Sequence, residues 1–145
     1  MSAVDRLILQ QRNRKAGQSL LEFALVVLFL VVVMIGIIDF ARFFFTYGTL
    51  ANAAREGARY AVVQPRDAAQ DAIASATTSV VVDKSLAGSV AVSPADVSVT
   101  WPDTDHVRVT VVCTYHPATA LIAEAAGIGP GGIVLRGSSQ MRREP

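Results

Sequence analysis

The sequence predicts an α+β fold in which one long N-terminal helix, membrane-spanning in its first half and amphipathic in its second, packs on a small antiparallel sheet of about three strands. Three observations predict this fold. Residues 23–38 are apolar without a charge or a proline, residues 40–61 carry apolar side chains every three or four positions, and residues 97–115 contain two runs that alternate apolar with polar side chains. These spacings are the periods of helix and strand.

The apolar run admits three interpretations. A cleaved secretory signal requires small residues directly after the run, whereas DFARFFF at 39–45 is bulky and charged. A buried core helix requires more surrounding chain than the short segments that follow can supply. A membrane span needs about 20 residues, which the run reaches when residues 18–22 are added. We therefore expect a transmembrane helix over about residues 20–38.

The residues that flank this helix predict its orientation. Asp39 and Arg42 follow the run, whereas four cations precede it: Arg6, Arg12, Arg14 and Lys15. Because the cytoplasmic flank of a membrane helix carries the excess of Lys and Arg, we expect the N-terminus in the cytoplasm. Residues 1–17 would then be a basic cytoplasmic leader, and the C-terminal part of the chain would lie outside the cytoplasmic membrane.

We expect one helix from about residue 18 to about residue 63, because no proline interrupts the pattern before Pro65. A stripe of small residues in its second half allows another backbone to approach closely: Ala51, Ala54, Ala58 and Ala61. Two interpretations of this stripe remain open. The alanines pack against the chain's own strands, or they contact helices of other subunits.

Residues 64–145 are expected to form a small α+β head outside the membrane. The expected elements, in chain order, are a helix at 66–82 and strands at 97–101, 107–115 and 133–141. The first two strands flank the turn sequence PDTD, which predicts a β-hairpin. Cys113 alternates with valines on the second strand, so we expect its thiol to be buried.

The sequence offers little for catalysis or for a cofactor. The net charge of +1 excludes the basic footprint of a nucleic-acid-binding protein, and the single cysteine cannot form an intramolecular disulfide. His106 and His116 would lie about 33 Å apart on one strand and could not share a metal. Asp103 and Asp105 are explained by their place in a turn. We therefore expect no enzyme, no metal, no cofactor and no small-molecule substrate.

One carboxylate, Glu22, lies near the start of the expected membrane helix, where a charge is unfavourable by about 3 kcal/mol at the bilayer centre and by less near the interface. Glu22 is the fifth residue after Gly17, which follows a short basic leader and precedes Gln18 and the apolar run. This pattern resembles the processing site of type IV prepilins. Without that resemblance, Glu22 would extend toward Lys15 and the lipid head groups.

The prepilin resemblance implies a role for each residue of the pattern. A membrane peptidase would cut on the cytoplasmic side, between Gly17 and Gln18. The leader cations of the pattern are Arg12, Arg14 and Lys15. Glu22 would meet the new amino group of Gln18 on a neighbouring subunit, since a buried charge is tolerated when it is paired.

Further features narrow the resemblance. The Glu22–Phe23 pair opens the apolar run, AREGARYA occupies 54–61, and SSQMRRE at 138–144 closes the chain after the expected hairpin. Together they are similar to the TadE-like family, the minor pilin-like proteins of tight-adherence (Flp) pili. The resemblance implies a pilin-like fold and a structural role, as a pseudopilin needed for pilus assembly, surface adhesion, biofilm formation or secretion.

The same resemblance implies the partners of the chain. These are the membrane, the prepilin peptidase, the Flp major pilin, sister minor pilins, and the assembly platform with its ATPase; no nucleic acid is expected. The alternative is a signal-anchored envelope protein with a small extracytoplasmic binding domain and no role in a fibre.

Overall fold

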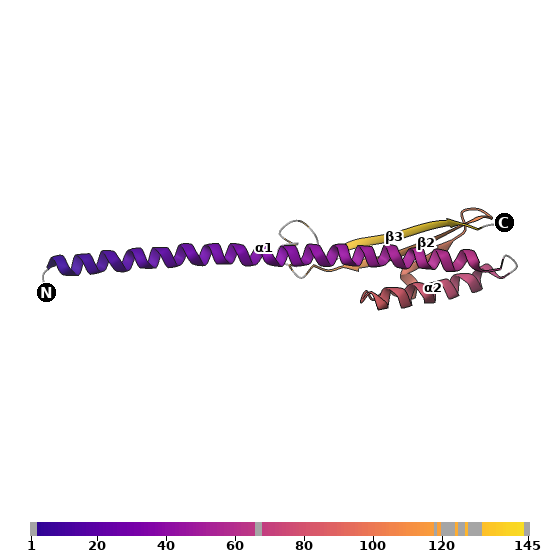
Figure 1. Cartoon of the computed structure of the whole chain (residues 1–145), viewed down its shortest axis with the longest axis horizontal. Helices are drawn as coiled ribbons and strands as arrows, with labels where there is room; N and C mark the ends of the chain where they lie inside the picture. Colours follow the sequence, from indigo (N-terminus) through magenta and orange to yellow (C-terminus); the bar gives the residue numbers. More distant parts are fainter. Residues whose placement is uncertain are drawn as a thin grey trace. The chain divides into compact units, whose positions relative to one another are not determined.

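The computed structural model (Figure 1) describes residues 3–65, 68–117, 119, 124, 127 and 132–143, and only the backbone of residues 3–16. The chain divides into a first unit, residues 1–38, and a second unit, residues 39–145. The described residues contain a long N-terminal apolar helix, a second helix and a three-stranded antiparallel sheet. The predicted α+β fold is therefore confirmed.

The long helix α1 (Ala3–Val63) begins earlier than predicted and ends where predicted. It begins at Ala3 rather than near residue 18, because the segment before Gly17 has no proline and is rich in Leu, Gln, Arg and Lys, which favour helix. One glycine costs about 1 kcal/mol in a helix, which does not stop it. Pro65 lacks a backbone N–H and cannot continue a helix, so α1 ends two residues before it.

The first unit exposes a continuous apolar surface on α1. Large apolar side chains between Leu20 and Ile38 are 38–70% exposed. Among the described residues, 17–63 form one helix that is long and apolar enough to cross a membrane. This exposure favours a membrane anchor over the core helix of a soluble protein, which would bury such side chains within the chain.

The second unit contains the rest of α1 and five shorter elements: α2 (Gln70–Ala87), the 3₁₀ helix η1 (Pro94–Asp96), β1 (Val97–Thr100), β2 (His106–Tyr115) and β3 (Ile133–Arg142). The strands lie in the order β1-β2-β3 and are antiparallel. In this register Val99 lies opposite Val109, and Val111 lies opposite Gly137. All three predicted strands are confirmed, each to within one residue at its ends.

The second helix was predicted at 66–82, but α2 begins at Gln70 and ends at Ala87. Its buried face explains the later end, because Ile73, Thr77, Val81 and Ser85 recur every fourth residue and are all buried. Two of these four residues are polar, so the stripe is not visible as an apolar pattern in the sequence. Gly88 then follows at the C-terminal cap.

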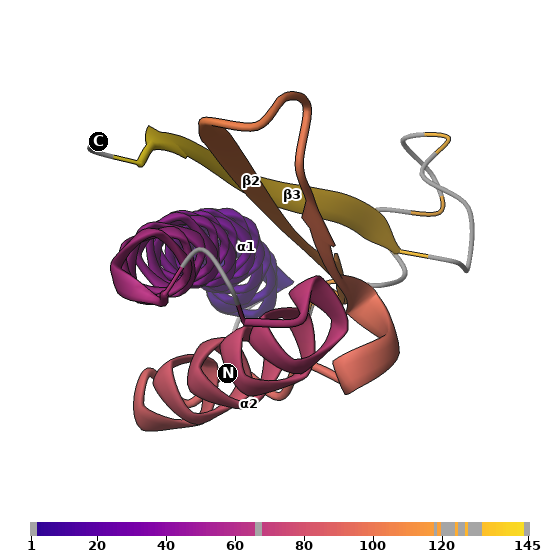
Figure 2. The same ribbon diagram turned by 90° about the vertical axis from the view of Figure 1, so that its right-hand side faces the viewer.

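The core of the second unit lies between α1, α2 and one face of the sheet (Figure 2). Ala54, Ala58 and Ala61 of α1 are fully buried there, and Ala51 is half-buried. The buried side chains of the other elements include Ile73, Val81, Val107, Val109, Val111 and Leu135. The alanine stripe therefore packs on the chain's own elements, as the first of its two interpretations held.

Candidate functional site

The residues of the predicted processing pattern all lie on α1. Gly17, Gln18 and Glu22 are exposed, and no atom lies within 4 Å of the position that a Cβ would take at Gly17. Gln18 and Glu22 are one helical turn apart and therefore share a face of the helix. The leader cations Arg12, Arg14 and Lys15 also lie on α1, but their side chains are outside the described part of the chain.

Glu22 lies in an apolar environment on the helix surface. Its neighbours Leu21 and Phe23 are 64% and 66% exposed, and the exposed run continues to Ile38. No side chain among the described residues forms a hydrogen bond or ion pair with the Glu22 carboxylate. If this run is inside a bilayer, the described side chains leave the Glu22 carboxylate there without a compensating charge, which is the costly arrangement.

A second carboxylate, that of Asp39, follows the apolar run directly and accepts hydrogen bonds from donors within the second unit. Asp39 is only 7% exposed. The backbone N–H and the hydroxyl of Thr119 both donate to its Oδ2, at 2.8 and 2.6 Å. The hydroxyl of Tyr115 donates to the Asp39 backbone carbonyl at 3.0 Å. These contacts tie the chain after β2 to the start of the head-side half of α1.

The Tyr115 side chain also packs on the aromatic residues of α1. Its ring meets the Phe43 ring edge to face, with centroids 5.8 Å apart. Burial raises the pKa of the Tyr115 hydroxyl, the nearby Asp39 carboxylate raises it further, and Arg42 opposes this shift. The hydroxyl is therefore a neutral donor at physiological pH, as its hydrogen bond to a carbonyl requires. In the sequence Asp39 is recognisable only as a flank of the membrane run, and no local pattern predicts this contact.

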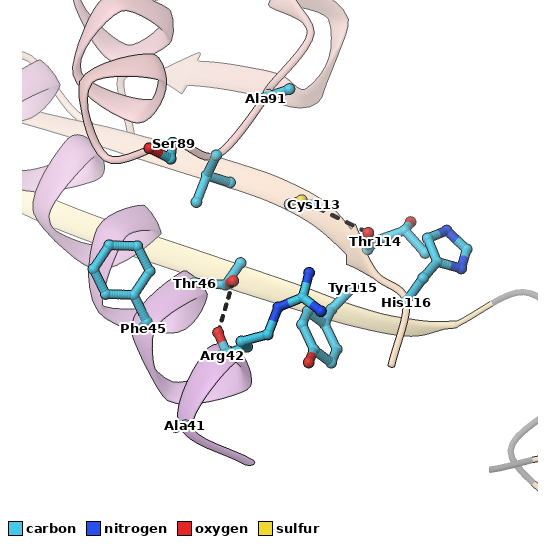
Figure 3. A pocket seen from close by; sticks show the side chains of 11 residues that line it. Ala41, Arg42, Phe45, Thr46, Ser89, Ala91, Cys113, Thr114, Tyr115 and His116 are labelled. Carbon is cyan, nitrogen blue, oxygen red and sulfur yellow. Dashed lines mark hydrogen bonds between the residues drawn. The ribbon is translucent and has the colours of Figure 1, made fainter. Parts of the chain in front are cut away.

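Near this contact, a groove with a volume of about 710 Å³ lies between α1, the turn after α2 and the end of β2 (Figure 3). Its lining residues are Ala41, Arg42, Phe45 and Thr46 of α1, Ser89, Val90 and Ala91 of the turn, and Cys113, Thr114, Tyr115 and His116 at the end of β2. Figure 3 shows the Arg42 guanidinium between α1 and β2, beside Tyr115.

Cys113 lies in this groove and is only partly buried, so the prediction of a buried thiol is corrected. The alternation with valines places Cys113 on the core side of β2, where it packs against the core, but the groove beside it leaves the side chain partly exposed. Burial, and secondarily the charge of Asp96, raises the pKa of the thiol. The thiol is therefore protonated at neutral pH and is a weak nucleophile.

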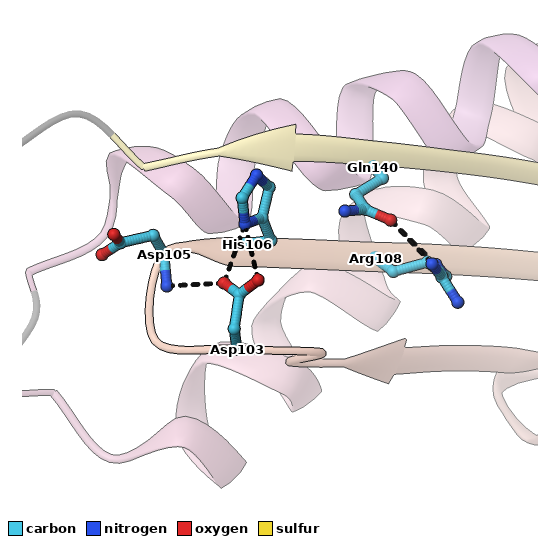
Figure 4. Close-up of polar contacts among 5 residues, drawn as sticks. All are labelled: Asp103, Asp105, His106, Arg108 and Gln140. Atoms are coloured by element: carbon cyan, nitrogen blue, oxygen red, sulfur yellow. Dashed lines mark hydrogen bonds and ion pairs between the residues drawn. The ribbon is translucent and has the colours of Figure 1, made fainter.

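In the acidic turn before β2, the Asp103 side chain holds the turn together by contacts with Asp105 and His106 (Figure 4). His106 Nδ1 lies 2.8 Å from both carboxylate oxygens of Asp103, and the Asp105 backbone N–H donates to Asp103 Oδ1 at 2.9 Å. These bonds, the histidine contact first, lower the pKa of the Asp103 carboxyl. Among the described residues no three His, Cys, Asp or Glu side chains are grouped to hold a metal ion.

The two histidines lie at opposite ends of β2, as predicted. His106 is its first residue, and His116 follows its last residue, Tyr115. Another polar pair links two strands of the sheet, since the Arg108 guanidinium donates to Gln140 Oε1 on β3 at 2.7 Å (Figure 4).

The comparisons with known proteins agree with the pattern on α1. No curated protein and no solved structure matches the chain. A family model described as TadE-like protein matches residues 17–59, a range that begins at the predicted cleavage glycine and includes Glu22 and the buried alanines Ala54 and Ala58. Residues 17–59 are therefore a TadE-like segment, and the resemblance predicted from the sequence is confirmed over that range.

Proposed function

We propose that the protein is a minor pilin-like subunit of a tight-adherence pilus, needed for pilus assembly, surface adhesion and biofilm formation. Residues 20–38 would cross the cytoplasmic membrane, with the N-terminus in the cytoplasm and the head of residues 64–145 outside. One observation carries the proposal. Glu22, whose carboxylate has no partner among the described side chains, lies on an exposed apolar helix, five residues after Gly17, inside the TadE-like segment.

The proposed mechanism follows from the cost of that charge. Cleavage between Gly17 and Gln18 by a prepilin peptidase would create an amino group at Gln18. Its charge complements the Glu22 carboxylate of a neighbouring subunit, either the Flp major pilin or a sister minor pilin. The pairing removes a cost of up to about 3 kcal/mol that the isolated subunit bears in the bilayer. Association would therefore be favoured only after processing and with subunits of matched depth.

The exposed apolar surface of α1 supports the same proposal. A subunit that leaves the bilayer for a fibre must keep its apolar run covered, and only the apolar helices of other subunits can replace the lipid there. The assembly platform and its ATPase would supply the work of extraction. The second unit has its own core, so it can keep its fold during this transfer.

The test is the mass of the protein isolated from its native host. Mature protein that begins at Gln18 is expected. A Gly17→Leu variant should retain the leader because the bulky side chain blocks cleavage, whereas the matched Gly17→Ala variant should be processed. Wild-type protein that retains Met1 or Ser2 would contradict the proposal.

A signal-anchored envelope protein with a binding head is the second candidate, and the groove beside Tyr115 favours it. In that case the leader stays attached and loss of the gene leaves the pili intact. Electron microscopy of pili from a deletion strain, combined with the mass measurement, separates the two functions.

A further inference from the structure

The sheet of the second unit has one face that no other described element covers. The core packs on the opposite face, on the side where α2 and the second half of α1 lie (Figure 2). Because side chains alternate along a strand, every second residue points away from that core. These residues, all exposed or half-buried, form the outer face: Ser98 and Thr100 of β1, His106, Arg108, Thr110, Val112 and Thr114 of β2, and Val134, Arg136, Ser138, Gln140 and Arg142 of β3.

The outer face carries three guanidiniums and no carboxylate. Arg108 donates to the neutral side-chain oxygen of Gln140 (Figure 4), and no described residue forms an ion pair with Arg136 or Arg142. Glu144 follows Arg142 by two residues in the sequence and lies outside the described residues, so we assign the main roles to Arg108 and Arg136.

The described acids that border the outer face act elsewhere. Asp103 contacts His106 in the turn, and the pKa of its carboxyl is lowered by His106 and by backbone N–H groups, not by an arginine. Figure 4 shows the Asp105 carboxylate directed away from the strands. After burial, the charge of Asp96 raises the pKa of the Cys113 thiol, which lies on the core side. Among the described residues, the positive charge of the outer face therefore stays uncompensated.

The three arginines form a line along the sheet. Arg136 and Arg142 are six residues apart on β3, which is about 20 Å at the rise of a strand. Arg108 lies between them on β2, opposite Gln140 in the register. A small anion can contact only part of this line, whereas a linear polyanion that lies along β3 can reach all three guanidiniums. Each guanidinium can bind a carboxylate through two parallel N–H donors.

The other side chains of the outer face favour a sugar polymer over a nucleic acid or a protein. Sugar hydroxyls donate and accept hydrogen bonds, and so do the five hydroxyl side chains of this face. It has no Phe, Tyr or Trp, on which proteins stack the bases of single-stranded nucleic acids. Its only aliphatic side chains are Val112 and Val134, whereas the centre of a protein–protein interface is rich in apolar and aromatic residues.

We propose that the outer face binds an acidic polysaccharide, a linear chain of carboxylated sugars, with Arg108 and Arg136 as the main carboxylate ligands. Arg142 supplies a further cation, and the hydroxyl side chains meet the sugar hydroxyls. All of these residues belong to the second unit, so binding does not require a particular position of the apolar run, cleavage at Gly17 or a role in a pilus. The second unit would attach the protein to a polysaccharide layer.

The test measures binding of the full chain, in a nonionic detergent, to immobilised polygalacturonate by biolayer interferometry. We expect binding to this polymer and not to neutral dextran, and weaker binding as NaCl is raised, since salt screens exposed charges. Arg108→Gln and Arg136→Gln should each weaken binding about fivefold, the upper end for one exposed charge pair. The matched control Arg59→Gln removes the same charge from an exposed position on α1 and should change binding less than about twofold.

A second variant blocks the outer face without removing an arginine. Ser138→Glu places a carboxylate between the arginines at an exposed position and should also weaken binding about fivefold, by repelling the polymer. Equal binding to dextran, unchanged binding by the folded Arg108→Gln and Arg136→Gln variants or by Ser138→Glu, or an equal loss in Arg59→Gln would overturn the proposal. So would binding of single-stranded DNA or polyglutamate as tight as that of polygalacturonate, since the partner would then be a nucleic acid or an acidic protein segment.

Discussion

Replacing Gly57 with alanine is expected to destabilise the second unit, although glycine to alanine within a helix usually stabilises it. A Cβ at position 57 would overlap a methyl group of Val81 on α2 and would lie 3.3 Å from a methyl carbon of Val109 on β2. Val81 and Val109 are both fully buried, so neither can move without disturbing the core. Overpacking of this kind costs about 1–3 kcal/mol.

Gly48 is the matched control on the same helix. No atom lies within 4 Å of the position of its Cβ, so Gly48→Ala should gain only the helix-propensity difference of about 1 kcal/mol. Gly57→Ala gains the same amount and loses the overpacking term. The two variants should therefore differ in free energy of unfolding by about 1–3 kcal/mol, with Gly48→Ala the more stable.

Thermal unfolding of the full chain in detergent measures this difference. Trp101 is the single tryptophan and lies in the second unit, so its fluorescence reports on that unit. For a domain of this size about 1 kcal/mol shifts Tm by about 4–8 °C. A Gly57→Ala protein as stable as Gly48→Ala would show that α1 and α2 are not packed as closely as the structure indicates.

Three further changes test other contacts. Glu22→Ala should leave membrane insertion intact or improve it and should reduce pilus number in electron micrographs; normal pili would contradict the pairing mechanism. Tyr115→Phe removes the hydrogen bond to the Asp39 carbonyl and should lower Tm by about 4–8 °C, the effect of about 1 kcal/mol, measured by Trp101 fluorescence. Asp103 has a pKa lowered by His106, so its carboxylate stabilises the folded state at neutral pH, and this contribution is lost as the pH falls below the ordinary value of 3.8. Urea midpoints at pH 6 and pH 3 should therefore differ less in Asp103→Asn than in wild type.

The strands and the end of α1 could be predicted because local chemistry decides them. Alternation with a period of two residues places Val107, Val109 and Val111 on the core face, and each is fully buried. Pro65 stops α1 whatever surrounds it. The position of α2 could not be predicted, because Thr77 and Ser85 belong to its buried face and are polar.

The contact between Asp39 and the chain after β2 was not predictable for a different reason. Tyr115 and Thr119 lie 76 and 80 residues from Asp39 in the sequence, and no periodic pattern relates positions so far apart. The groove depends on the same long-range packing. A carboxylate directly after an apolar helix is the one local signal, since it must find donors when the fold buries it.

Asp39 and Glu22 differ in the contacts that the described residues offer them. Both carboxylates adjoin the apolar run, and both would be costly without partners in a medium of low dielectric. Folding supplies the donors of Thr119 to Asp39. No described residue supplies a donor to Glu22, and the apolar side chains around it are exposed. The contacts of the described residues therefore account for Asp39 but not for Glu22. Under our proposal the partner of Glu22 is the free amino group of a neighbouring subunit at the same depth, which has the charge that Glu22 needs.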